Sequence, residues 1–237
     1  MTVEALLKRY AAGERSFQGM NLREIDLHYA QLQAVNFNQV DLRQARLGKA
    51  DFSQASFRAA DLSEAILWGT DLSAADLSQA ILREADLSGT KLSHANLEQA
   101  NLSKASLGGA ILVQARLLQA NLFAADLRPT SDQGTDLGHA ILSDADLCYA
   151  KLSGVLLYQA NLDGAKLCRA QLNRTLQQGL QPTNLSQASL RGADLSYADL
   201  TGAILRKANL IGADLTGAVL ADVDWQGAIM PDGSVHE

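Results

Sequence analysis

Leucine or phenylalanine recurs at every fifth position along most of this chain, and a small residue, most often alanine, stands two positions earlier. The register begins at Phe17 and continues through Leu22 and Leu27, and one unit reads Ala60-Asp61-Leu62-Ser63-Glu64. A period of five fits neither regular element. Successive leucines would turn by about 140° around a helix, and in a strand they would alternate between its faces. The pattern predicts a unit of one short extended side and one corner, with two of five residues pointing inward.

Four such sides close a square coil of 20 residues, and Phe17, Phe37 and Phe57 support this higher period because they recur at that spacing. Coils stacked at the inter-strand distance of about 4.8 Å give an all-β solenoid, a rod of about ten coils and roughly 50 Å. Each coil buries little alone, so stability comes from stacking. The central residues predicted to form the core include Phe17, Phe37, Phe57, Leu62, Leu77, Leu102, Leu147, Leu195 and Trp225.

The repeat resembles the Ala-(Asp/Asn)-Leu-X-X motif of the pentapeptide-repeat family. Matches include Ala75-Asp76-Leu77, Ala95-Asn96-Leu97, Ala193-Asp194-Leu195 and Ala213-Asp214-Leu215. The resemblance covers nearly the whole chain and implies a right-handed quadrilateral β-helix. The entry to the repeats and the Pro-Asp-Gly exit are most similar to cyanobacterial members of unassigned function.

Departures from the register divide an otherwise continuous single domain, residues 1–237. The spacing of ten between Leu127 and Leu137 keeps the phase, whereas the spacing of 13 between Leu172 and Leu185 shifts it. Each interruption is either a recognition loop or tolerated drift at a corner. The predicted segments are repeat coils at 15–127, 135–174 and 183–230, loops at 128–134 and 173–182, and a tail at 231–237.

Both ends of the predicted rod carry residues that could cover it. Residues 2–12 predict a capping helix, with Thr2 as N-cap, Gly13 past its end, and an apolar face of Val3, Leu6, Leu7 and Tyr10. The alternative is a helix that binds a partner. At the other end, the bulky Trp225 is predicted to plug the last coil.

Charge and composition exclude several classes of function. The chain has 26 acidic and 20 basic residues, a net charge of −6, and its acidity leans towards the C-terminal half. Clustered Lys and Arg, which phosphate binding needs, do not occur, so no direct nucleic-acid binding is expected. No apolar run is long enough to span a membrane and no secretory signal is evident, which predicts a cytoplasmic protein.

Cys148 and Cys168 lie one coil apart, and each follows a central leucine. They should therefore point outward, one above the other, at a Cα separation within disulfide range. In a reducing cytosol we expect two free thiols that fill equivalent positions, with a redox switch as the alternative.

The sequence provides no constellation for catalysis, since its four histidines are scattered and its serines are repeat positions without a neighbouring base. We therefore expect no enzyme activity, no metal site and no cofactor. What stands out is outward apolar surface on the coil at 111–123 and near it, which is either scattered exposure or an interface. The candidate interaction residues are Ile111, Val113, Leu118, Phe123, Trp68 and Tyr158.

Two functions remain open. The first is a non-enzymatic, rod-like scaffold that binds an unidentified protein partner. The second is a DNA-mimicking modulator of DNA gyrase, a role that the family resemblance implies for some members. Moderate acidity, outward arginines and the lack of a C-terminal helical dimerisation module argue against the second. A monomer is slightly favoured.

Overall fold

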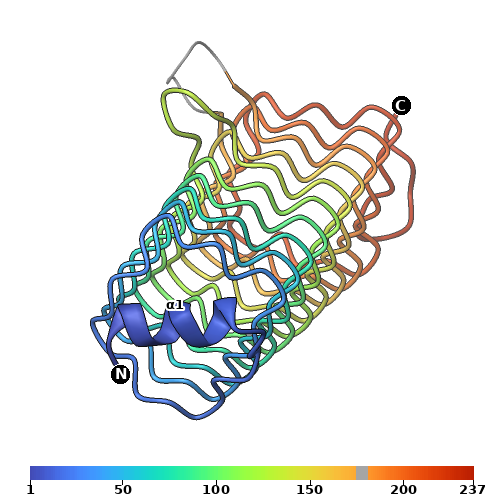
Figure 1. Ribbon diagram of the computed structural model, residues 1–237. Helices are drawn as coiled ribbons and strands as arrows, with labels where there is room; N and C mark the ends of the chain where they lie inside the picture. The colour runs from blue at the N-terminus through green and yellow to red at the C-terminus, as the bar shows by residue number, and fades with distance from the viewer. Residues whose placement is uncertain (175–180) are drawn as a thin grey trace.

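The computed structural model describes residues 1–174 and 181–237. The chain winds into stacked square coils that form a rod, with one helix, α1 (Val3–Ala11), lying across the first coils (Figure 1). Consecutive coils are joined by parallel bridges, from Ser16↔Asn36 to Asn209↔Ile229. Each side of a coil is bridged at a single residue, so the expected extended sides are shorter than strands throughout the described residues.

The rod has four faces, named here by their first central residue: face 1 from Phe17, face 2 from Leu22, face 3 from Leu27 and face 4 from Leu32. In the repeats before the last coil the central residue is buried, and with few exceptions so is the inward residue, and two turn residues follow outside. The second turn residue takes the left-handed conformation, with φ of 57° at Gln39 for example. Backbone N–H groups then point along the rod, and that of Leu62 donates to Ile81 one coil later at 2.7 Å.

Aspartate or asparagine is frequent before the central leucine because its side chain closes the turn that follows. Asp61 Oδ1 accepts the N–H of Ser63 at 3.0 Å, an arrangement that recurs along the rod. The same carboxylates that could be taken for catalytic groups are therefore structural.

Central residues fill the core along its length. Phe17, Phe37 and Phe57 are fully buried and stack on face 1, with ring centroids 5.8 and 5.6 Å apart. Phe52 joins them from face 4, 5.3 Å from Phe57. Five predicted core leucines are also fully buried, namely Leu62, Leu77, Leu102, Leu147 and Leu195.

The N-terminal helix forms as expected, with Thr2 accepting the N–H of Ala5 at 3.3 Å. Leu6 is fully buried on the first coil and Val3 and Tyr10 are partly buried, whereas Leu7 is exposed. The prediction that Leu7 faces the core is wrong, because the helix lies flat and buries a narrower stripe than its apolar face.

Both interruptions leave the rod at one corner, between faces 3 and 4. The bridges Ile111↔Asp136 and Leu156↔Asn184 span them, so the coils resume in line after each. The predicted loop at 173–182 lies partly outside the described residues.

A threonine supports the hydrogen-bond ladder at each exit. In an uninterrupted coil the N–H of the second turn residue donates to a backbone carbonyl of the next coil. At the first exit Gly109 N–H donates instead to Thr135 Oγ1 at 2.7 Å. At the second, Gly154 N–H keeps the Asn173 carbonyl at 3.3 Å and also donates to Thr183 Oγ1 at 2.9 Å. Both threonines are fully buried, which explains a polar residue at an inward position.

At the opposite end of the rod from α1, the last coil is more open. Trp225 takes a central position and packs against the core while staying partly exposed, so it covers this end only in part. Further coverage comes from residues 231–236, which turn back along face 1, where Ile229 and Val235 form an antiparallel bridge.

Candidate functional site

The structure separates the predicted interaction residues rather than gathering them. Leu118 lies on face 1, Phe123 on face 2 and Trp68 on face 3. The remaining three lie on face 4, where the Tyr158 ring covers Gly138 and is directed towards the preceding coil; these three are Ile111, Val113 and Tyr158. The outward apolar coil is therefore not one patch.

Trp68 belongs to a small cluster on face 3 near the N-terminal end. Its ring lies 5.7 Å from that of His28, and the Lys49 ammonium sits 4.6 Å from the Trp68 ring and 5.8 Å from the Tyr29 ring. Gly48 leaves room for this packing, since a Cβ there would meet His28 and Trp68 within 2.8 Å. The Lys49 ammonium therefore already occupies much of the ring surface that Trp68 and Tyr29 could offer to a partner.

A longer stack runs along face 2 in the C-terminal half, which we call the aromatic ladder (Phe123, Tyr149, Arg169 and Tyr197). The Phe123 and Tyr149 rings are 5.5 Å apart, and the Arg169 guanidinium lies 5.0 Å from the Tyr197 ring. Phe123, Tyr149 and Tyr197 are 39, 49 and 57% exposed. Bridges place these residues on four successive coils, so the ladder presents a continuous ridge.

Sequence reasoning found Phe123 but missed both tyrosines. Each occupies the second turn position, where the left-handed backbone directs a side chain furthest from the rod, with φ of 60° at Tyr149 and 57° at Tyr197. A tyrosine at that position is the signal that could have identified them, because most coils carry glycine, alanine or a polar residue there.

Cys148 and Cys168 lie beside the ladder and form a disulfide, with Cα atoms 4.6 Å apart. The expectation of two free thiols is wrong: identical positions on stacked coils bring the two sulfur atoms into bonding distance. Cys148 is also nearly buried, at 7% exposed, although it takes an outward position. The disulfide joins the coil of Tyr149 to that of Arg169.

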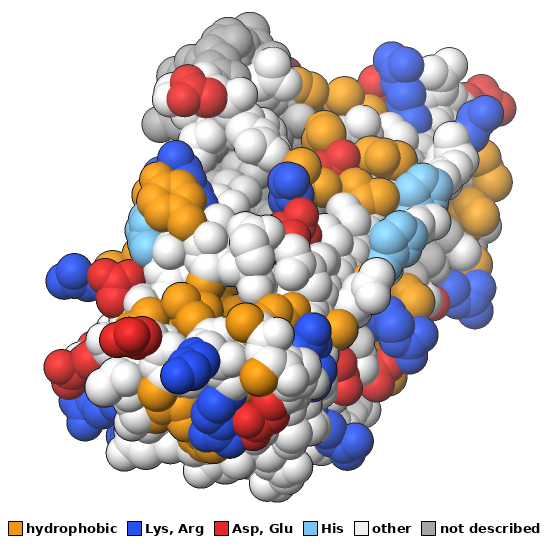
Figure 2. Space-filling model, in the orientation of Figure 1, with side chains coloured by type: hydrophobic (Ala, Val, Ile, Leu, Met, Phe, Trp, Pro, Cys, Tyr) orange, Lys and Arg blue, Asp and Glu red, His pale blue; other side chains and the backbone are white. Residues whose placement is uncertain are grey.

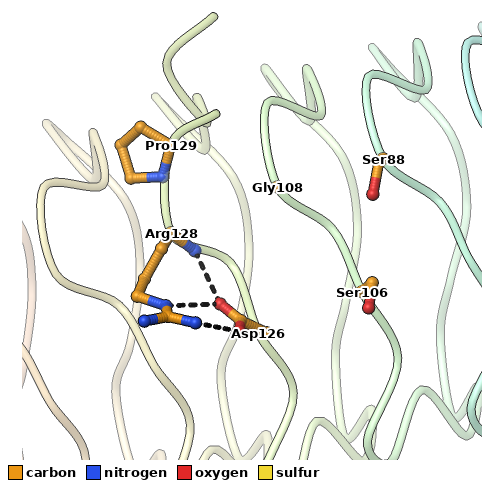
Figure 3. A pocket seen from close by; sticks show the side chains of 6 residues that line it. All are labelled: Ser88, Ser106, Gly108, Asp126, Arg128 and Pro129. Atoms are coloured by element: carbon orange, nitrogen blue, oxygen red, sulfur yellow. Dashed lines mark hydrogen bonds and ion pairs between the residues drawn. The ribbon is translucent and has the colours of Figure 1, made fainter. Parts of the chain in front are cut away.

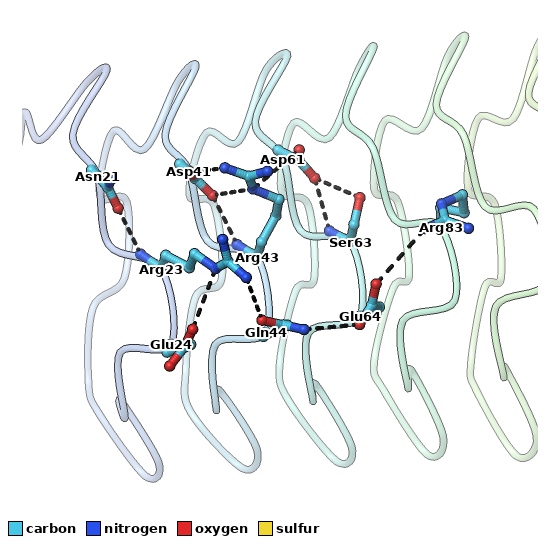
Figure 4. A network of polar contacts seen from close by, with 10 residues as sticks. All are labelled: Asn21, Arg23, Glu24, Asp41, Arg43, Gln44, Asp61, Ser63, Glu64 and Arg83. Atoms are coloured by element: carbon cyan, nitrogen blue, oxygen red, sulfur yellow. Dashed lines mark hydrogen bonds and ion pairs between the residues drawn. The ribbon is translucent and has the colours of Figure 1, made fainter.

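The N-terminal half of face 2 is charged instead, and its charges are paired (Figure 4). Arg43 forms two bonds with Asp41, at 2.9 and 2.6 Å, and lies 3.7 Å from Asp61 on the next coil. The side-chain hydrogen bond from Arg43 lowers the pKa of Asp41. Further along, Arg83 approaches Glu64 at 3.7 Å.

Face 3 carries a shallow depression of about 270 Å³ next to the first interruption (Figure 3). Asp126 at its edge accepts bonds from the Arg128 guanidinium at 2.9 and 2.6 Å and from Lys151 at 3.3 Å. Burial alone would raise the pKa of Asp126, but the bonds from Arg128 and the charge of Lys151 lower it. A carboxylate held ionised in this way is a poor general acid or base near neutral pH. The described residues lining the depression are Ser88, Ser106, Gly108, Asp126, Arg128 and Pro129.

Within the described part of the chain, no group of three or more His, Cys, Asp or Glu side chains is placed to hold a metal ion. A search of the same residues finds no helix that could cross a membrane.

The chain is similar to several solved structures. HetL, a pentapeptide repeat protein involved in heterocyst differentiation regulation from the cyanobacterium Nostoc sp. strain PCC 7120, is 61% identical over all of both chains, with a TM-score of 0.99. The pentapeptide repeat protein alr5209, also from Nostoc, is 43% identical over 48% of this chain and 80% of its own, with a TM-score of 0.24. Full-length QnrB1, a plasmid-mediated fluoroquinolone resistance protein, is 20% identical over 92% of this chain and 94% of its own, with a TM-score of 0.37.

A comparison with curated proteins finds no match. The family model described as pentapeptide repeats matches residues 15–44, 41–79, 80–117, 100–128, 140–176 and 183–230. This match and the likeness to HetL imply a right-handed quadrilateral β-helix. The chain belongs to the pentapeptide-repeat family.

Proposed function

We propose that this protein is a non-enzymatic, rod-like interaction module that binds a regulatory protein through the aromatic ladder. The observation that carries the proposal is the exposure of three aromatic rings and a stacked arginine on four successive coils. Tyrosine and arginine dominate the binding energy of protein interfaces, so a contiguous ridge of them suits a protein partner.

The rod favours binding because its geometry is set before the partner arrives. Every coil is hydrogen-bonded to its neighbours, and the disulfide fixes two of the four coils that carry the ladder. A partner then meets side chains that lose little conformational entropy on binding. We further infer that the repeats act as a single unit of about ten coils, roughly 50 Å long at the spacing of stacked strands.

The likeness to HetL supports a regulatory context. A relative that is 61% identical along the whole chain is involved in heterocyst differentiation regulation. We propose that this protein likewise acts in the control of cell differentiation by binding one of its regulatory proteins.

The alternative of a DNA-mimicking gyrase modulator gains no support from the surface. A mimic of duplex DNA needs rows of free carboxylates, whereas Asp41, Asp126 and Glu64 face arginines within 4 Å. Figure 2 shows acidic, basic and apolar side chains interspersed on the face towards the viewer. The likeness to QnrB1 is too distant to carry an argument.

The test is capture of partners from a cell extract by the full chain and by the double variant Tyr149→Ala, Tyr197→Ala. Each ring should contribute about 1–2 kcal/mol, so the double variant should bind its partner at least about tenfold more weakly. Tyr29→Ala is the matched control, since Tyr29 is 61% exposed and also occupies a second turn position, but on face 3.

Equal capture by the double variant and by the control would overturn the ladder as the binding surface. A supercoiling assay with gyrase should show no effect of the protein, with or without a quinolone. Inhibition or protection there would favour the alternative.

A further inference from the structure

The last coil, residues 211–230, differs from the others in how its central residues are covered. From Phe17 to Leu210, central residues are at most 2% exposed. In the last coil Leu220 is 38% exposed, and Leu215 and Trp225 are only partly buried. The following coil would normally cover these side chains, so the end of the rod presents apolar core to solvent.

The backbone of this coil is also open. In the coil before it, the N–H groups of Leu200 and Leu205 donate to Val219 and Asp224 at 2.9 and 2.8 Å. The corresponding groups of the last coil have no partner among the described residues. They are the N–H groups of Leu215, Leu220 and Trp225 and the carbonyl groups of Ala213, Ala218 and Val223. Such an edge is a template for another extended segment.

The chain's own last residues already add an extended segment to part of this edge. After Met230 the backbone turns and pairs in antiparallel fashion with face 1, through the bridge Ile229↔Val235. The Gly227 and His236 N–H groups donate to His236 and Ala228 carbonyls at 2.8 and 2.9 Å. This added segment covers only face 1, and the edges of faces 2, 3 and 4 stay open.

The charge of the last coil and tail indicates what kind of segment would bind at the open edge. Residues 211–237 contain five acidic residues and no lysine or arginine, in a chain that has 20 of these bases elsewhere. Asp214 and Asp222 are exposed at the open edge, and the only arginine that approaches Asp222 among the described residues is Arg174, at 3.3 Å. A second copy meeting this end face to face would set like charges together, which disfavours it.

We propose that the open end of the rod is a docking site for a segment of a partner protein that adds to the last coil as one more rung, with apolar residues at the inward and central positions of the five-residue spacing and basic residues at the outward positions. This inference rests on the proposed function as an interaction module but uses the end of the rod, whereas the aromatic ladder runs along face 2. Backbone bonds to the edge supply affinity, the apolar side chains cover Leu215, Leu220 and Trp225, and the basic ones meet Asp214 and Asp222.

The first experiment uses a fluorescent fifteen-residue peptide of three Ala-Lys-Leu-Lys-Gly units, titrated against the full chain by anisotropy. The matched peptide of Ala-Glu-Leu-Glu-Gly units should not bind, because its charges have the same sign as those of the edge. The lysine peptide N-methylated at the residue before each leucine should also fail, since it cannot complete the ladder. On binding, hydrogen exchange should slow at the amides of Leu215, Leu220 and Trp225.

The double variant Asp214→Lys, Asp222→Lys should weaken peptide binding about tenfold or more, which is about 1.4 kcal/mol. Asp132→Lys, a charge reversal in the first interruption, should leave it unchanged. Leu220→Ser, at a partly exposed position, provides a second variant that does not depend on charge, and it should also weaken binding.

Equal affinity for the lysine and glutamate peptides, or unchanged hydrogen exchange at the edge, would overturn the proposal. So would a concentration-dependent dimer that buries this end in analytical ultracentrifugation. Phe123→Ala, Tyr149→Ala, which changes only ladder residues remote from the last coil, should leave peptide binding intact, so a failure of this proposal and a failure of the ladder proposal give different results.

Discussion

The two ends of the rod are built from the same repeat but are covered in different ways. At one end α1 buries Leu6 and Phe17 completely, and the Tyr10 hydroxyl donates to the Gln33 carbonyl at 2.9 Å. At the other end no helix covers the last coil (Figure 1), and Leu220 is 38% exposed. A central leucine is therefore core only when something stacks on it, and its identity alone does not decide its burial.

The largest effect that separates the ends should come from one pair of leucines. Leu6→Ala removes a fully buried side chain between α1 and the first coil, so it should cost about 2–5 kcal/mol. Leu220→Ala should cost less than about 1 kcal/mol, because that side chain is already partly in water. Urea unfolding of both variants measures the difference, and equal losses would contradict the unequal burial of Leu6 and Leu220.

The C-terminal half of the rod has no helical lid, but it contains the disulfide, which should stabilise the folded state. The disulfide closes a loop of about 20 residues, and reducing it or introducing Cys168→Ser should cost about 3 kcal/mol on the chain-entropy account. Ser196→Ala, at the same position on the next coil of face 2, is the control and should be nearly neutral. Unchanged urea midpoints with and without dithiothreitol would contradict a stabilising disulfide.

The helical lid itself should depend on its cap. Thr2→Ala removes the acceptor for the Ala5 N–H, and N-cap losses cost about 1 kcal/mol. The effect should appear as faster hydrogen exchange in α1 and a lower urea midpoint. Thr216→Ala, in the last coil, should not alter exchange in α1; if it does, the two ends are coupled and are not independent structures.

The five-residue register predicted most of the fold, because each central position must be apolar for the coils to stack. It also predicted that Cys148 and Cys168 lie one above the other, but it did not predict that they form a disulfide. It could not show which apolar turn residues share a face, since that depends on how the interruptions at 128–134 and 173–182 reset the coils. Leu118 and Phe123, by contrast, lie on different faces simply because they belong to consecutive repeats.

The surface residues that the sequence pattern did not identify were missed for one common physical reason. Tyr149 and Tyr197 lie 48 residues apart and meet the same surface only because one interruption shifts the coil register between them. Likewise, Leu215 and Leu220 follow the same motif as buried leucines, and nothing in the motif marks the coil on which stacking stops. Local pattern predicts the repeat; contacts between repeats decide the surface.

The smallest predicted effect is a pH dependence confined to the lid. The hydrogen bond from Arg9 lowers the pKa of Glu14, with their charge attraction acting in the same direction and burial opposing both. A depressed folded-state pKa stabilises the protein above the unfolded value of about 4.3, and this stabilisation is lost as pH falls through the folded-state pKa. The melting temperature of the native protein should therefore exceed that of Glu14→Gln near neutral pH, and the gap should close in acid.

A methyl resonance of Leu6, followed by NMR, places this effect at the lid. Acidification should shift it in the native protein and not in Glu14→Gln, because Arg9 then no longer holds the chain that follows α1. Asp214→Asn is the control at the other end: hydrogen bonds from Thr216 lower the pKa of Asp214, but this carboxylate touches no lid. Its Leu6 resonance should titrate as in the native protein, and a flattened titration would mean that the two ends respond to pH as one unit.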